Sequence, residues 1–165
     1  MKKIICLLCF LFVLCGCSKN KITEITAAVL LPQEQLAPYL EYVPEFSEKT
    51  SRHYSIAEYR PNPRGSNDPV IIKVYQENQL YSKNKILDYY NECKELRTDA
   101  FTIDSLGADC FVAYPSIHYY INGYHVEITA GSGSDNDQKI LLMNLAKISL
   151  ENLNEYKDVL SVNEE

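Results

Sequence analysis

The sequence contains no tryptophan, only six cysteines and only six glycines, and the placement of its cysteines excludes a disulfide-rich secreted scaffold. Four of the cysteines lie within the first 17 residues, so the rest of the chain has only Cys93 and Cys110. Two cysteines do not make the disulfide framework of a small secreted scaffold, although they can form one bond in an oxidising compartment. Two separate buried thiols are the alternative. The apolar run at 4–14 has 11 residues, well short of the roughly 20 that a membrane-spanning helix needs, and no later stretch is long enough either.

Basic residues are also fewer than acidic residues. The chain has 16 Lys and Arg against 22 Asp and Glu, which gives a formal net charge of −6. Nucleic-acid phosphates require a basic protein face, and anionic lipid surfaces attract clusters of Lys and Arg. The composition therefore predicts no nucleic-acid partner, and the chain has no polybasic segment that would hold it on a membrane.

The N-terminus combines three features of an export signal. Two early lysines form a positive segment, the run at 4–14 forms a hydrophobic segment, and "LCGC" follows at 14–17. This arrangement resembles the lipobox of bacterial lipoproteins. The resemblance implies cleavage between Gly16 and Cys17 and a diacylglycerol on the Cys17 thiol. The protein would then be lipid-anchored to a bacterial membrane in the cell envelope, with its domain outside the cytoplasm. A plain secretory signal or an uncleaved anchor is the alternative.

These boundaries divide the chain into four parts. The expected division is a lipoprotein signal peptide at 1–16, a lipidated tether at 17–26, an α+β domain at 27–157 and an acidic tail at 158–165. Processing would leave 149 residues with 14 basic and 22 acidic side chains, a formal charge of −8. A chain of this length can bury one good core and is most simply one domain.

Local patterns predict a mixed fold. Alternating and β-branched residues predict strands, and apolar residues that recur every three or four positions predict helices. Strands are expected at 54–59, 70–76, 101–105 and 109–114 and in a hairpin at 117–130, and helices at 32–42, 82–97 and 138–156. We therefore expect an α+β domain in which a single antiparallel β-sheet packs against helices.

Several short motifs occur in an order that resembles a known family. They are "LLPQEQLAPYL" early in the domain, "IDSLGADCFVAY" after the central helix, then "IHYYINGYHVEITAG" and a closing "NLAKISLENL". Together they resemble small bacterial lipoproteins whose folded domain is PsbP-like, and the resemblance covers most of 27–156. It implies a membrane-tethered envelope protein with a PsbP-like domain and implies no catalytic residue.

The clearest local signal is the hairpin around Asn122–Gly123, the preferred dipeptide of a two-residue type I′ turn. This turn pairs His118 with Glu127 and Tyr120 with His125, and strand alternation places all four side chains on one face. A histidine beside a carboxylate suits a general base or a metal ligand, but a third ligand at known spacing is missing. We therefore predict a ligand or partner face at these four residues and assign no catalytic residue, cofactor or metal. The alternatives are a solvated strand face, a patch covered by the last helix, or a hydrolase or metal site at His118, His125 and Glu127.

The central helix and the tyrosines are the remaining features. The predicted inward stripe of the helix at 82–97 is Ile86, Tyr90, Cys93 and Leu96, which makes Cys93 a core thiol. The chain has 13 tyrosines, several of them in the late strands. Tyrosine suits interfaces, but ordinary sheet packing also explains it. His53 stands alone and is expected on the surface.

These features favour a non-catalytic binding or accessory module of the cell envelope. Its lipid anchor on Cys17 would hold it at the membrane, where it would contact an envelope protein or a wall ligand. The second interpretation is a structural or stress-related envelope lipoprotein without a discrete ligand.

Overall fold

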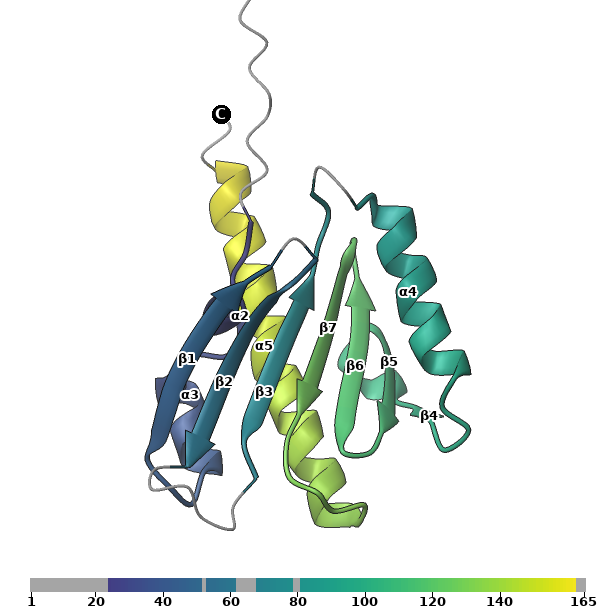
Figure 1. Ribbon diagram of the computed structural model, residues 1–165. Coiled ribbons are helices and arrows are strands. Elements are labelled where there is room, and N and C mark those ends of the chain that lie inside the picture. Colours follow the sequence, from purple (N-terminus) through teal and green to yellow (C-terminus); the bar gives the residue numbers. More distant parts are fainter. Residues whose placement is uncertain (1–23, 52, 62–67, 79–80, 163–165) are drawn as a thin grey trace, which may run out of the picture.

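The domain is built on one seven-stranded antiparallel sheet (Figure 1). The structure is a computed structural model that describes residues 24–51, 53–61, 68–78 and 81–162. The predicted α+β class, with a single antiparallel sheet packed against helices, is confirmed. The expected signal peptide and Cys17 lie outside the described residues. No helix in the described ranges is long and apolar enough to cross a membrane.

The sheet consists of two meanders joined along their inner strands. The strand order is β1-β2-β3-β7-β6-β5-β4, so β3 and β7 are the only neighbours that are neither consecutive in sequence nor joined by a hairpin. The strands are β1 (Pro44–Thr50), β2 (Ser55–Pro61), β3 (Val70–Tyr75), β4 (Phe101–Thr102), β5 (Asp109–Ala113), β6 (Ser116–Ile121) and β7 (Tyr124–Thr129). All neighbouring strands are antiparallel.

Helices cover the two faces of the sheet unequally (Figure 1). The helices are α2 (Ala27–Leu30), α3 (Gln33–Leu36), α4 (Lys83–Glu95) and α5 (Asn136–Val162), with 3₁₀ turns at Ala37–Tyr39 and Asp104–Leu106. One face packs against α5 and α2. On the other face α4 contacts β6 and β7, and β1, β2 and most of β3 lie open beside it.

The main core lies between the sheet and the α5–α2 layer. Ile72, Ile117 and Ile128 from the sheet pack with Leu142 and Leu145 from α5, all with no exposed surface. Burying such side chains stabilises the fold by roughly 1.5–3 kcal/mol each. A smaller cluster of Tyr90, Phe111 and Ala113 fills the space beneath α4.

The chain enters the domain at one end of this sheet. The backbone N–H of Ile25 donates to Oε1 of Gln76 at 2.9 Å, and Nε2 of Gln76 donates to the carbonyl of Ile25 at 2.8 Å. The N–H of Ala27 donates to Oγ of Ser55 at 2.9 Å. Because Gln76 directly follows β3 and Ser55 begins β2, the first described residues are fastened where these two strands meet.

Four local expectations need correction. The helix expected at 32–42 is instead the short helix α3 followed by the 3₁₀ turn Ala37–Tyr39, because prolines stand at 32 and 38 and proline removes a backbone donor. No local pattern predicted β1, in which every residue after Pro44 is exposed. Leu96 is 74% exposed rather than part of the inward stripe. The last helix continues through Val162 instead of ending at 156.

Candidate functional site

The hairpin has the predicted register. Asn122 and Gly123 have φ values of 53° and 91°, the left-handed conformations that a type I′ turn requires. Tyr120 pairs with His125 and His118 with Glu127, so all four predicted side chains lie on the face that α4 partly covers. The sequence therefore placed these residues together correctly.

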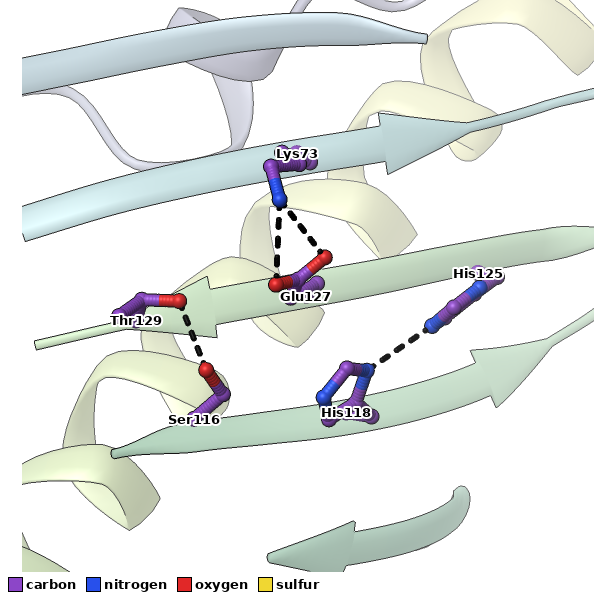
Figure 2. Close-up of polar contacts among 6 residues, drawn as sticks. All are labelled: Lys73, Ser116, His118, His125, Glu127 and Thr129. Atoms are coloured by element: carbon purple, nitrogen blue, oxygen red, sulfur yellow. Dashed lines mark hydrogen bonds and ion pairs between the residues drawn. The ribbon is translucent and has the colours of Figure 1, made fainter. Parts of the chain in front are cut away.

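His118 and His125 form a buried pair rather than an accessible site. Their Nδ1 and Nε2 atoms, respectively, are 3.2 Å apart and share a hydrogen bond (Figure 2). His118 is 6% exposed and His125 is fully buried. The His118 ring stacks on Phe111, and Tyr90 of α4 meets the His125 ring edge-on. The helix that covers this patch is α4, so the alternative of a patch under the last helix is wrong.

Burial keeps both rings neutral at physiological pH. Desolvation, which disfavours the charged form, lowers the pKa of His118 to about 4 and that of His125 to about 3. Nδ1 of His125 has no hydrogen-bond partner. Within the described part of the chain, no three His, Cys, Asp or Glu side chains gather in a group that could hold a metal ion.

Glu127 and Tyr120 have other partners. The Glu127 carboxylate accepts two hydrogen bonds from Nζ of Lys73 on β3, at 3.2 and 3.1 Å (Figure 2). Its strongest contact is therefore with a neighbouring strand and not with His118 across the hairpin. Tyr120 is half-buried, and its ring lies 5.7 Å from that of Tyr90.

An open cleft lies beside the histidine pair, between the first half of α4, the start of β2 and the end of β3. Its volume is about 280 Å³. Of the seven described residues that line it, five carry aromatic rings, and we call it the aromatic cleft. The lining residues are His53, Tyr54, Tyr75, Tyr81, Lys85, Ile86 and Tyr89.

Tyr75 links the aromatic cleft to the buried pair. Its ring centroid lies 5.4 Å from that of Tyr54 and 5.1 Å from that of Tyr89, and it stacks on His125 at 5.0 Å. Burial raises the pKa of Tyr75, so its hydroxyl stays protonated. Ring contacts thus connect Tyr75 at the cleft floor to the residue before β2, to α4 and to β7.

The outer rim of the aromatic cleft is more exposed and carries charge. His53 and Tyr81 meet edge to face at 5.1 Å, and Nζ of Lys85 lies 5.9 Å from the centre of the Tyr81 ring. Tyr89 is 41% exposed. A ligand in the cleft would therefore meet apolar ring faces, phenolic hydroxyls and one ammonium group.

Comparison of the chain with protein-family models, with curated proteins and with solved structures finds no match. The resemblance to PsbP-like lipoproteins consequently stays a prediction. The site has to be interpreted from its own geometry.

Sequence reasoning missed the aromatic cleft. Its tyrosines are spread over 54–89, between two strands and a helix, and no local motif joins them. The one available signal was the high tyrosine content, which the late strands were expected to explain. His53, expected to be an isolated surface residue, is part of the rim.

The two cysteines of the domain are free thiols. Cys110 is paired across strands with Tyr119, whose hydroxyl bonds to Ser149 of α5 at 2.7 Å, so Cys110 belongs to the α5 face. Cys93 lies on α4, at the opposite face. The sheet separates the thiols, and the possible Cys93–Cys110 bond is absent from the structure.

Proposed function

We propose that the protein is a lipid-anchored, extracytoplasmic binding or accessory module of the cell envelope, without catalytic activity of its own, and that the aromatic cleft is its binding site. The cleft is the observation that carries this proposal. At about 280 Å³ it is close to the lower end of the range of small-ligand sites, roughly 300–1,000 Å³. Its mixture of ring faces and a few polar groups is typical of such sites.

The cleft is formed by well-packed elements, which supports a binding role. Tyr54 directly precedes β2, and Tyr75 is the last residue of β3, which pairs with β2. Tyr89 is held by its ring contacts with Tyr75 and His125. Side chains fixed in this way lose little conformational freedom when a ligand binds, which favours affinity.

The geometry favours binding over the hydrolase or metal alternative. Both histidines are occupied with each other beneath α4, and Glu127 is occupied with Lys73. A general base has to come within hydrogen-bond distance of its substrate, and the buried His118 and His125 are poorly placed for such contact.

Native mass spectrometry of the protein, extracted gently from its own membranes, tests the proposal. We expect a chain that begins at a lipid-modified Cys17 and carries an additional bound mass. Tyr89→Ala should lose that mass, whereas Leu96→Ala, an exposed apolar residue just beyond the same helix, should retain it. Retention in both variants would contradict a site in the aromatic cleft.

The anchor has a separate test. Cys17→Ala removes the thiol that would carry the lipid, so we expect an unprocessed chain that keeps residues 1–16. An intact mass that matches an unlipidated chain in the wild-type protein would contradict the anchor.

A further inference from the structure

The aromatic cleft lies at the end of the domain where the chain arrives from the anchor. Gln76 and Ser55, which fasten Ile25 and Ala27, directly follow Tyr75 and Tyr54 of the cleft in sequence. Glu24 itself shares a surface hollow with His53 and Tyr54. In Figure 1 this end is the top of the sheet, where the β1–β2 turn and the beginning of α4 also lie.

The length of chain before this point limits how far the cleft can be from a membrane. Cys17 and Glu24 are seven residues apart, and seven residues span at most about 25 Å when fully extended. A domain held by Cys17 thus has this end within reach of the bilayer surface. The opposite end of the sheet, where β2 ends and β3 begins, is farther away by the length of a strand.

We propose that the aromatic cleft docks onto the bilayer that holds the anchor and takes up the headgroup region of one phospholipid. This inference rests on the proposed lipid anchor and names the ligand of the proposed site. Tyrosine is suited to the membrane interface, because its ring enters the apolar boundary while its hydroxyl stays hydrated. Tyr81 and Tyr89 at the rim supply such rings, and Lys85 supplies a cation for the lipid phosphate.

The charges around the cleft indicate that ring insertion, and not electrostatic attraction, dominates the docking. Lys85 is the only Lys or Arg among the lining residues that the structure describes, and the acidic Glu24 lies in the neighbouring hollow. Attraction of a basic segment to anionic lipid adds about 1 kcal/mol per Lys or Arg and weakens with salt. Docking through the aromatic cleft should therefore change little between low and high salt.

The absence of tryptophan from the sequence allows a direct test. The lipidated full-length protein is reconstituted into vesicles of phosphatidylethanolamine and phosphatidylglycerol whose acyl chains carry bromine, which quenches nearby tryptophan. Tyr81→Trp places the only tryptophan at the cleft rim. Leu96→Trp is the matched control, because it is exposed at the far end of α4. We expect blue-shifted emission and several-fold greater quenching for Tyr81→Trp than for Leu96→Trp.

The other outcomes separate the two proposals. If both variants carry lipid on Cys17 and neither tryptophan is quenched, the cleft does not dock and this inference is overturned, while the anchor stands. Equal quenching at both positions also overturns it, because the domain would then have no preferred orientation. If Cys17 carries no lipid, the anchor fails, and this inference, which rests on it, fails with it.

A second variant tests the contribution of the cleft itself. Tyr89→Ser in the Tyr81→Trp background removes a rim ring and should reduce the quenching several-fold. Ile140→Ser, which truncates an exposed apolar residue on α5, should leave it unchanged. Quenching that survives Tyr89→Ser in full would show that the tether alone brings this end to the membrane.

Discussion

His118 and His125 show how two polar rings are accommodated beneath a helix. Their hydrogen bond needs one donor and one acceptor, so it requires at least one neutral ring. Each lowered pKa means that the unfolded chain binds protons more strongly than the folded chain does. The contribution of this pair to the free energy of unfolding is therefore fully present above the pKa that histidine has in the unfolded chain, and it is lost as the pH falls below that value.

We expect the free energy of unfolding to fall as the pH drops from about 6.5 towards 4. The upper limit of this pH range is the ordinary histidine pKa. The lower limit is set by the pKa values of the two histidines in the folded chain, about 4 and 3. Since one pKa unit corresponds to about 1.4 kcal/mol, the loss from this pair at pH 4 is on the order of 3 kcal/mol or more. Urea denaturation followed by circular dichroism across this range measures it.

The double variant His118→Phe/His125→Phe is the control for this pH dependence. Replacing both partners of a buried bond by apolar groups of similar shape is often nearly neutral, and Phe111 and Tyr75 offer stacking surfaces for the new rings. We expect the double variant to fold at pH 7 and to lose less stability than the wild type between pH 6.5 and 4. Identical pH profiles would exclude the pair as the cause.

At the scale of elements, position 123 in the β6–β7 turn has a backbone conformation that only glycine adopts easily. Gly123 has a φ of 91°, and a Cβ atom there would lie 2.9 Å from Cγ of Lys83 at the beginning of α4. Lysine is flexible, so the backbone conformation is the larger penalty.

Gly123→Ala should therefore destabilise the domain by about 1 kcal/mol. Gly133→Ala is the matched control, because its added Cβ would meet nothing closer than 3.6 Å and its φ is not in the left-handed region. Thermal unfolding of the two variants compares them directly. An equal effect at both positions would contradict the strain argument.

The same elements show what local sequence can predict. The hairpin register followed from one turn dipeptide. The helix α4 begins within one residue of its predicted start, and the Ser82 side chain caps it by accepting a hydrogen bond from the N–H of Lys85. The strand β1 was not predicted, because it is an exposed edge strand with charged residues and no alternation of apolar and polar residues. Leu96 fits the helical period, but α4 ends at Glu95, and nothing packs over the next residue.

The candidate site was predictable only in part, because some of its residues lie far apart along the chain. The polar face of one hairpin depends on alternation within a dozen residues, and its four members were found. Whether that face is open depends on where α4 crosses the sheet, and the aromatic cleft depends on three separate elements. Neither is encoded in a local pattern.

At the scale of the whole molecule, the sheet separates two layers of the described domain, with Cys93 in one layer and Cys110 in the other. Cys110 is 2% exposed, and burial raises its pKa to about 12. Cys93 is half-buried, with a pKa that burial also raises. The thiolate is the reactive form, so lower exposure and a higher pKa both make the Cys110 thiol react more slowly than that of Cys93.

We expect a maleimide reagent to label Cys93 slowly in the native protein and Cys110 only after unfolding. Peptide mapping by mass spectrometry resolves the two positions. A crosslinked Cys93–Cys110 peptide from non-reduced protein would contradict the separation of the layers, as would equal labelling rates in the native state.

The junction between the two meanders also has a consequence for engineering. Each meander is a continuous stretch of chain, and the sheet becomes continuous only through the five residue pairs from Ile71–Thr129 to Tyr75–His125. A cut between β3 and α4 would give two fragments, each with its own hairpins, that meet along this seam and where α2 packs against α5. The connection between β3 and α4 is thus the point at which the chain divides into its two meanders, and reassembly of the two fragments would report their proximity.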